Sequence, residues 1–198
     1  MMRELKEYIP EYKKMIDEAY ASMDIPEMEK ALCILNKAMV DRRNIFTCGN
    51  GGSAAIAEHI TCDFNKGVAS DTEIRPMFVP LASNISLLTA IANDHNWYEV
   101  YSKQIENTRS TGNVLFAISS SGDSLNIVNA CKAAKDKGWG VISFVGFTGG
   151  AVKDLSDACI HIKSNNYGVV EDCHHMLMHI LAQHLRIAHQ SSDYRMKL

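Results

Sequence analysis

Val114-Leu115-Phe116-Ala117-Ile118 is a run of apolar residues that leads directly into the polar turn Ser119-Ser120-Ser121-Gly122-Asp123-Ser124, and a stretch with helical spacing follows to about Lys137. The run is apolar at every position. A parallel sheet covered by helices on both faces contains strands of this kind, whereas a sheet with one face in water alternates polar and apolar residues. The sequence therefore predicts an α/β fold, with a doubly wound parallel sheet flanked by helices.

The same succession of strand, polar turn and helix recurs along the chain. Further strands are expected at about 44–48, 76–80, 140–145 and 158–162, and further helices at about 53–65, 83–93, 97–108 and 169–189. Ahead of the first strand, apolar residues three and four apart predict two helices, at 3–21 and 27–41. We expect residues 1–198 to form one domain that includes this N-terminal helical leader (1–42). With little sheet to cover, the leader is expected to pack against another subunit.

Composition and charge exclude several classes of protein. The 198 residues are 46% hydrophobic and 22% charged, which is typical of soluble globular proteins. The net charge of -3 includes no basic run, which argues against nucleic-acid binding. There is no run of about 18 apolar residues and no signal-peptide core near the N-terminus, so we expect no membrane span and a cytoplasmic location. The six cysteines form no CxxC pair and are expected to be free thiols.

The turn at Ser119–Ser124 carries four hydroxyls, at Ser119, Ser120, Ser121 and Ser124, immediately before a helix. Hydroxyl donors, free backbone N–H groups and the positive end of a helix together suit a phosphate dianion. A simple helix cap would need only one Ser or Thr. The turn therefore predicts a phosphate site.

A second polar turn, Cys48-Gly49-Asn50-Gly51-Gly52-Ser53, follows the first strand. It has neither the Lys of a P-loop nor the spacing of a dinucleotide-binding motif, so its glycines do not predict nucleotide binding. Glycine permits a close approach of the backbone to a ligand. The alternative is a tight turn in which Ser53 caps the next helix.

Two clusters of ligating side chains occur at helical spacing. His59 and Asp63 lie four residues apart, and so do the members of the series Glu171, His175 and His179, with His174 beside them. A His and a carboxylate from each of two helices suit a tetrahedral zinc site or an acid-base pair. Spacing alone does not choose among His174, His175 and His179, and single helical histidines are often structural or solvated.

As a set, the motifs resemble one known family over essentially the whole chain. They are Gly49–Ser53, Ala92-Asn93-Asp94, Ile118–Ser124 and Met178-His179-Ile180-Leu181, in this order after a two-helix leader. The chain resembles the sugar isomerase (SIS) domain of phosphoheptose isomerases. The resemblance implies conversion of sedoheptulose 7-phosphate into D-glycero-D-manno-heptose 7-phosphate by a homotetramer with one zinc per subunit.

The resemblance also implies the residues of the site. In those enzymes a His and a Glu on one helix, and a Gln and a His on the last helix, hold zinc and substrate. The corresponding metal ligands here are His59, Asp63, Glu171 and His179, of which Asp63, Glu171 and His179 are the implied catalytic residues. The implied substrate contacts are Asn50, Gly51, Gly52, Ser53, Asp63, Asn93, Asp94, Ser119, Ser120, Ser121, Ser124 and Glu171. Taken alone, Asn93 and Asp94 are equally suited to capping the end of their own helix.

This sequence departs from the family pattern at three points. Asp63 replaces a Glu, Glu171 replaces a Gln, and an Arg expected after the first site helix is missing, with Lys66 nearby. The hypothesis is proton transfer through an enediol, in which Asp63 or Glu171 is the base and His179 is the partner acid or base. The alternatives are an isomerase of another sugar phosphate and a noncatalytic SIS-type regulator that binds a sugar phosphate or a protein.

Overall fold

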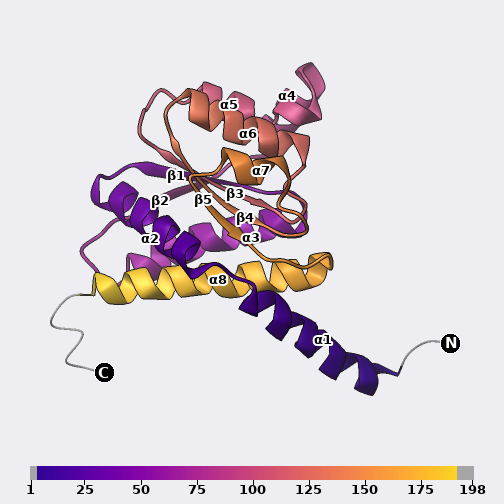
Figure 1. The fold of residues 1–198 in the computed structure, drawn as a ribbon. Coiled ribbons are helices and arrows are strands. Elements are labelled where there is room, and N and C mark those ends of the chain that lie inside the picture. Colours follow the sequence, from indigo (N-terminus) through magenta and orange to yellow (C-terminus); the bar gives the residue numbers. More distant parts are fainter. Residues whose placement is uncertain (1–3, 191–198) are drawn as a thin grey trace.

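The computed structural model describes residues 4–190, and it contains a central sheet with helices on both sides (Figure 1). The sheet has five strands in the order β2-β1-β3-β4-β5, and every pairing is parallel. The strands are β1 (Asn44–Cys48), β2 (Met77–Pro80), β3 (Val114–Ser119), β4 (Gly140–Val145) and β5 (Ala158–His161). The predicted doubly wound parallel sheet is confirmed.

The strand order places a topological switch between β1 and β3. From β1 the chain proceeds outward to β2, then returns to the other side of β1 and builds β3, β4 and β5. Cys48, at the end of β1, pairs with Ala117 near the end of β3. The glycine turn and the hydroxyl turn therefore leave the sheet side by side, where ligands bind in sheets of this type.

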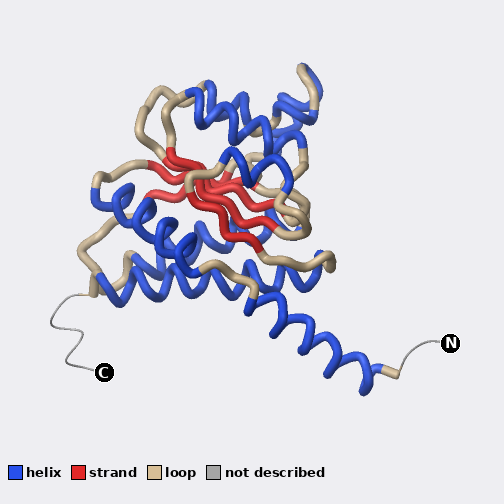
Figure 2. Tube along the Cα trace, viewed as in Figure 1, coloured by secondary structure: helices blue, strands red, loops and turns tan. Residues whose placement is uncertain are grey.

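Helices cover both faces of the sheet and bury two apolar clusters (Figure 2). On one face lie α2 (Ile25–Val40), α3 (Gly52–Cys62) and α8 (Tyr167–Ala188). On the other face lie α5 (Ser102–Glu106), α6 (Leu125–Asp136) and α7 (Gly150–Leu155), with α4 (Ile85–Asp94) beside them. All six residues of β3 are buried, as a strand in the centre of such a sandwich requires.

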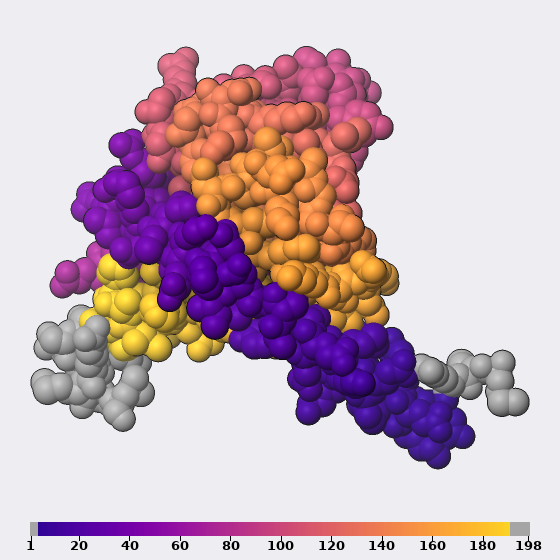
Figure 3. All heavy atoms as spheres, in the orientation of Figure 1, coloured from indigo at the N-terminus to yellow at the C-terminus, as the bar shows by residue number. Residues whose placement is uncertain are grey.

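The leader consists of α1 (Leu5–Ala21) and α2, close to the two helices predicted; Arg3, where the first was expected to begin, lies outside the described residues. The expectation that it has little sheet to cover is wrong for α2, because Ala31 and Leu35 are fully buried in the core of one face. In the space-filling view α1 extends beyond the body of the molecule (Figure 3). It is anchored to α8 by the Tyr12 hydroxyl, which donates to the Asp172 carboxylate at 2.8 Å.

Three short elements differ from the prediction. A π-helix at Asp63–Val68 continues α3 beyond the helix expected to end at about residue 65, and a 3-10 turn at Trp97–Glu99 forms the start of the helix expected at 97–108. The third element, α7, was not predicted; its N-cap Gly149 and its first residue Gly150 both have positive φ. Helices as short as α7 leave a weak periodic signal, and π-helical turns have no sequence signature of their own.

Candidate functional site

The four hydroxyls of the turn differ in their partners. The Ser119 and Ser121 hydroxyls accept hydrogen bonds from the Gly122 and Asp123 N–H groups, each at 3.2 Å, and can still donate to a ligand. Ser124 is the N-cap of α6, yet its hydroxyl makes no capping hydrogen bond, so the cap alternative does not account for it. The Ser120 hydroxyl is buried and has no hydrogen-bond partner among the described residues. A buried hydroxyl without a partner costs about 1–3 kcal/mol. The turn therefore holds unused donors beside a helix N-terminus, as an anion site requires.

Backbone packing fixes the shape of this turn. Gly122 has a φ of 70°, and a Cβ there would collide with the Gly149 carbonyl group. Asp123 accepts a hydrogen bond of 2.8 Å from the Ala151 N–H, which ties the turn to the start of α7. The loop at 146–150 therefore supports the hydroxyl turn. Sequence reasoning missed it, although the pair Gly149-Gly150 was a visible signal.

The glycine turn after β1 leads into the N-terminus of α3. Gly51 is the N-cap and has a φ of 53°, so the alternative in which Ser53 caps this helix is wrong. Asn50 and Asn126 exchange two amide hydrogen bonds, at 2.9 and 2.8 Å, which connect the two turns. The Tyr101 hydroxyl donates to the Gly49 carbonyl at 2.6 Å. Asn126 and Tyr101 were not predicted, because their roles depend on contacts between distant segments.

The two turns line one cavity of about 390 Å³. It contains nine of the predicted substrate contacts: Asn50, Gly51, Gly52, Ser53, Ser119, Ser120, Ser121, Ser124 and Glu171. Phe147 and Tyr167 add aromatic surface, and Glu171 from α8 contributes a carboxylate. A single cavity lined by both turns agrees with the expectation that the two turns lie together at one edge of the sheet.

Glu171 is the only ionisable carboxyl group among the residues that line this cavity. Its side chain lies directly over Gly52, where any Cβ would collide with the carboxylate. Burial, and then the negative charge of Asp172, raises the pKa of Glu171 above its ordinary value. A raised pKa makes the Glu171 carboxylate a better proton acceptor than an ordinary Glu side chain.

A second group of side chains converges about two turns further along α8, where this helix packs against the end of α3 and its π-helical continuation. His59 and Asp63 from the α3 side meet His179 from α8, and one ligand atom from each lies within 4.8 Å of the others. Nε2 of His59 lies 3.5 Å from Oδ1 of Asp63, and Nε2 of His179 lies 3.4 Å from Oδ2. We call His59, Asp63 and His179 the His-Asp-His triad.

The donors and spacing of the triad fit zinc. Zinc binds imidazole nitrogen and carboxylate oxygen at about 2.0–2.2 Å, so two ligand atoms in a tetrahedral site lie roughly 3.4 Å apart. The two Asp63 distances match this spacing. Glu171 is not part of the group, and its predicted role as a metal ligand stays a prediction.

The structure separates the three candidate histidines of α8. His174 is fully buried, its Nε2 lies 3.2 Å from the Val145 carbonyl oxygen, and burial lowers its pKa to about 4. It is a core residue. The ring centroids of His175 and His59 lie 5.5 Å apart. Burial lowers the pKa of His175, and the charges of His59 and His179 lower it further.

Asn93 and Asp94 lie outside the cavity within this chain. Both are exposed at the end of α4, where the Asn93 amide donates to the Asp94 carboxylate at 2.8 Å. They are not among the residues that line the cavity. Their predicted contact with substrate stays a prediction.

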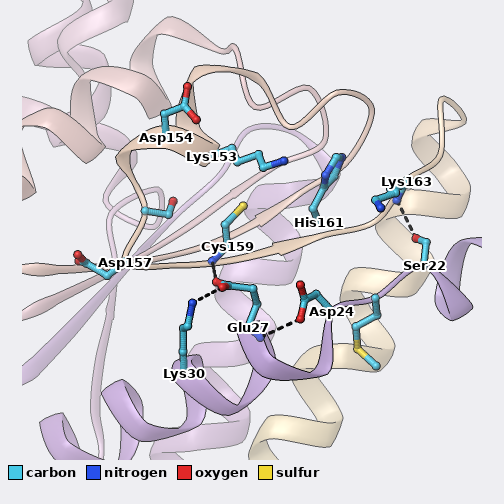
Figure 4. Close-up of a pocket in the computed structure, with 12 residues that line it drawn as sticks. Ser22, Asp24, Glu27, Lys30, Lys153, Asp154, Asp157, Cys159, His161 and Lys163 are labelled. Carbon is cyan, nitrogen blue, oxygen red and sulfur yellow. Dashed lines mark hydrogen bonds and ion pairs between the residues drawn. The ribbon is translucent and has the colours of Figure 1, made fainter.

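A larger cleft of about 640 Å³ lies at the β5 edge of the sheet (Figure 4). Several of its polar side chains accept hydrogen bonds from backbone N–H groups. Glu27 accepts a hydrogen bond of 2.9 Å from the Cys159 N–H and also pairs with Lys30. The Ser22 hydroxyl accepts a hydrogen bond from the Lys163 N–H at 2.9 Å. These contacts satisfy backbone donors in and just after the edge strand β5.

Comparison with known proteins agrees with this geometry. The SIS domain family model matches residues 7–146. A phosphoheptose isomerase from Nitratiruptor sp. is 33% identical over 91% of this chain and 96% of its own length. One from Coxiella burnetii is 36% identical over 75% of each chain. The solved structure of phosphoheptose isomerase GmhA from Neisseria gonorrhoeae superimposes with a TM-score of 0.81 at 28% identity, covering 91% of this chain and 96% of that one.

The chain belongs to the phosphoheptose isomerase family.

Membership of the phosphoheptose isomerase family is consistent with both halves of the site. The hydroxyl turn and its cavity occupy the switch point of the sheet, and the His-Asp-His triad lies on the two helices that border it. Among residues 4–190, no helix combines the length and the apolar character needed to cross a membrane.

Proposed function

We propose that this protein is a ketose-aldose isomerase that converts sedoheptulose 7-phosphate into D-glycero-D-manno-heptose 7-phosphate. The observation that carries the proposal is the meeting of His59 and Asp63 with His179 on the same pair of helices that borders the phosphate cavity. Relatives named phosphoheptose isomerase match over most of the chain. The substrate is therefore proposed as a phosphorylated acyclic sugar.

The phosphate end is proposed to bind at the hydroxyl turn. Ser119, Ser120, Ser121 and Ser124 supply hydroxyls, and the N-terminus of α6 supplies unpaired N–H groups and a positive dipole. No Lys or Arg is among the residues that line the cavity. Binding energy from this end fixes the distant carbons, so it lowers the barrier to proton transfer as well as strengthening binding.

The reaction moves one proton between two neighbouring carbons. A base removes the proton from C1 of the ketose, the electron pair forms a C1–C2 double bond, and the C2 oxygen gains a proton to give the enediol. The C1 hydroxyl then loses its proton, C1 becomes the aldehyde, and C2 takes up a proton. We assign the carbon base to Asp63 or Glu171 and the oxygen proton transfers to His179.

Zinc is the proposed cofactor, one per subunit, held by His59, Asp63 and His179. When bound, it would supply a Lewis acid that stabilises negative charge on the sugar oxygens. An imidazole nitrogen that binds zinc has no lone pair left to take up a proton, so with zinc bound the proton transfers assigned to His179 would pass to Glu171. Asp63 holds both imidazoles in place through its two oxygens, and the side chain of Glu171 faces the cavity. Resemblance to the family also suggests Glu171 as a further ligand.

The family resemblance further suggests a cytoplasmic homotetramer. Apolar side chains exposed on the two helices that form the lower part of Figure 1 support an assembly. On α1, Leu5 and Ile9 are exposed, and on α8, Met176 and Ile180 are exposed. An exposed apolar surface of this kind is more often buried in a protein–protein interface than left in contact with solvent.

The test is to incubate the purified protein with sedoheptulose 7-phosphate, once with zinc and once with a chelator, and to measure the aldose formed. The proposal predicts aldose with zinc and little or none with the chelator. Tight binding of the sugar phosphate without any aldose would contradict it and favour a noncatalytic regulator. Turnover of a different ketose phosphate alone would retain the isomerase and replace the substrate.

A further inference from the structure

Phe147 has a backbone conformation that is unusual for its residue type. It follows β4 in the loop at 146–150, and its φ is 48°. An aromatic residue rarely adopts this left-handed region, because its Cβ crowds the backbone there and the conformation is strained. The other two positions of the loop with positive φ, Gly149 and Gly150, are glycines, which adopt it without that strain. A strained residue beside a cavity points to a role for its side chain.

Hydrogen bonds on both sides of Phe147 hold this conformation. The Phe147 N–H donates to the Ser164 carbonyl oxygen at 3.0 Å, and Nε2 of His161 donates to the Phe147 carbonyl oxygen at 2.9 Å. The preceding residue, Gly146, is packed so closely against Val170 that a Cβ would collide with that side chain. The backbone of the loop is therefore fixed without a ligand, and it determines where the ring of Phe147 can lie.

The register of the sheet places Phe147 beside the hydroxyl turn. Ser119 pairs with Val145 at the ends of β3 and β4, and one residue further the Gly146 N–H donates to the Ser120 carbonyl oxygen at 2.9 Å. Phe147 is the next residue, so it leaves the sheet alongside the proposed phosphate site. It lines the same cavity as the four hydroxyls, and its partly buried side chain also packs against the apolar core.

We propose that Phe147 is a specificity-determining residue that binds the carbon chain of the sugar next to its phosphate. The ring offers an apolar surface to the C–H groups of the first carbons, whereas the hydroxyls of the turn bind the phosphate oxygens. This inference rests on the proposed binding of a sugar phosphate in this cavity and deepens it. It identifies the part of the site that distinguishes a phosphorylated sugar from phosphate alone.

The chemistry of the cavity supports this division of roles. A Phe side chain has no hydrogen-bonding group, so it gains from contact with carbon and not from contact with phosphate oxygens. Burial of about 55 Å² of apolar surface against the ring corresponds to a roughly tenfold gain in affinity. Tyr167, the other aromatic residue of the cavity, is 69% exposed, whereas Phe147 is partly buried and held in place, so it loses less freedom when a ligand binds.

The test compares two ligands that cannot isomerise. Sorbitol 6-phosphate has an acyclic carbon chain and a phosphate but no carbonyl group, and inorganic phosphate has no carbon chain. Isothermal titration calorimetry measures the affinity of each for the wild type, Phe147→Gly and Phe147→Leu. We expect Phe147→Gly to lose roughly tenfold in affinity for sorbitol 6-phosphate and to stay within about threefold for inorganic phosphate. Phe147→Leu keeps an apolar side chain and should stay within about threefold for both ligands.

Arg42→Gly is the matched control for the change of backbone strain. Arg42 is exposed, has a φ of 54° and lies just before β1, at the end of the sheet opposite the cavity, so its replacement should leave the affinity for both ligands unchanged. Circular dichroism shows whether the variants are folded, and Phe147→Asn, whose side chain tolerates positive φ, replaces Phe147→Gly if that variant does not fold.

Two results would overturn the inference. An equal loss of affinity for both ligands in Phe147→Gly would show that the residue acts through the shape of the phosphate turn. An unchanged affinity for sorbitol 6-phosphate in the same variant would show that the ring contacts no carbon of the sugar. Turnover of sedoheptulose 7-phosphate by the wild type reports on the proposed function separately, because neither probe can react.

Discussion

Oδ2 of Asp63 lies 3.4 Å from Nε2 of His179, although the two residues belong to helices that are far apart in the sequence. The other oxygen of the same carboxylate lies 3.5 Å from His59. Asp63 therefore joins two imidazoles that would otherwise have no fixed relation. Its side chain is one methylene shorter than the Glu expected from the family pattern, yet it spans the distance because α3 and α8 pack side by side at this level.

Asp63 is predicted to hold the metal and both imidazoles, so Asp63→Asn should remove one charged ligand and lower turnover of sedoheptulose 7-phosphate by roughly 100-fold or more. Asp63→Glu keeps the charge and should retain zinc. Steady-state kinetics and zinc content measured on the same samples check this. Equal turnover by Asp63→Asn and the wild type would rule out the role of this carboxylate.

The contact between Gly52 and Glu171 predicts that the two positions act together. In Gly52→Ala the new methyl group displaces the Glu171 carboxylate, which is the flexible end of a side chain, so the protein should fold with little change in melting temperature. Turnover should fall about as far as in Glu171→Ala. In a double-mutant cycle the two changes should be strongly non-additive. Fully additive losses would show that Gly52 acts on the reaction without Glu171.

Ser120→Ala is predicted to have opposite effects on stability and on substrate binding. Its hydroxyl is buried without a partner among the described residues, so its removal should leave the free energy of unfolding unchanged or raise it by up to about 1 kcal/mol. Affinity for sedoheptulose 7-phosphate should fall by about tenfold, since a donor to phosphate is lost. Urea denaturation and calorimetric titration measure the two effects. A destabilised variant with unchanged affinity would contradict the assignment of Ser120 to phosphate.

The lowered pKa of His174 predicts that the folded protein loses stability in acid. Burial lowers its pKa from 6.5 to about 4 in the folded protein, so between these values the unfolded chain binds the proton and the folded chain does not. Stability is then fully retained above about pH 6.5 and declines as the pH falls toward about 4, by about 2 kcal/mol at about pH 5. Replacing His174 with Gln should make this decline shallower, which urea denaturation at about pH 7.5 and about pH 5 would detect. An unchanged pH dependence would place the acid sensitivity elsewhere.

The fold was predictable because its strands carry a strong local signal. The run at 114–118 is apolar at every position, and the runs at 44–48 and 140–145 are mostly apolar. Residues 45–48, 114–118 and 141–145 are all buried, as a sheet covered on both faces requires. The two polar turns were predictable as a site, since the carboxyl ends of neighbouring parallel strands share one edge of the sheet. The orphan Ser120 hydroxyl and the free Ser124 side chain agree with that prediction.

The rest of the site depends on packing that spacing does not encode. His174 and His175 are neighbours in the sequence, but a helix turns successive residues by about 100°, so one points into the core and the other toward α3. Which face of α8 meets the sheet is decided by the whole apolar stripe of that helix. The Asn50–Asn126 pair and the support of Gly122 by Gly149 likewise join segments that have no local relation.

The most direct test of the account is the conversion of sedoheptulose 7-phosphate by His179→Ala, followed by NMR in D2O. His184→Ala, an exposed histidine on the same helix, serves as the control. We expect the wild type and the control to form the heptose 7-phosphate and to exchange the C1 proton for deuterium, whereas His179→Ala should stay folded and do neither. Aldose formation by His179→Ala at the wild-type rate would contradict the proposed site.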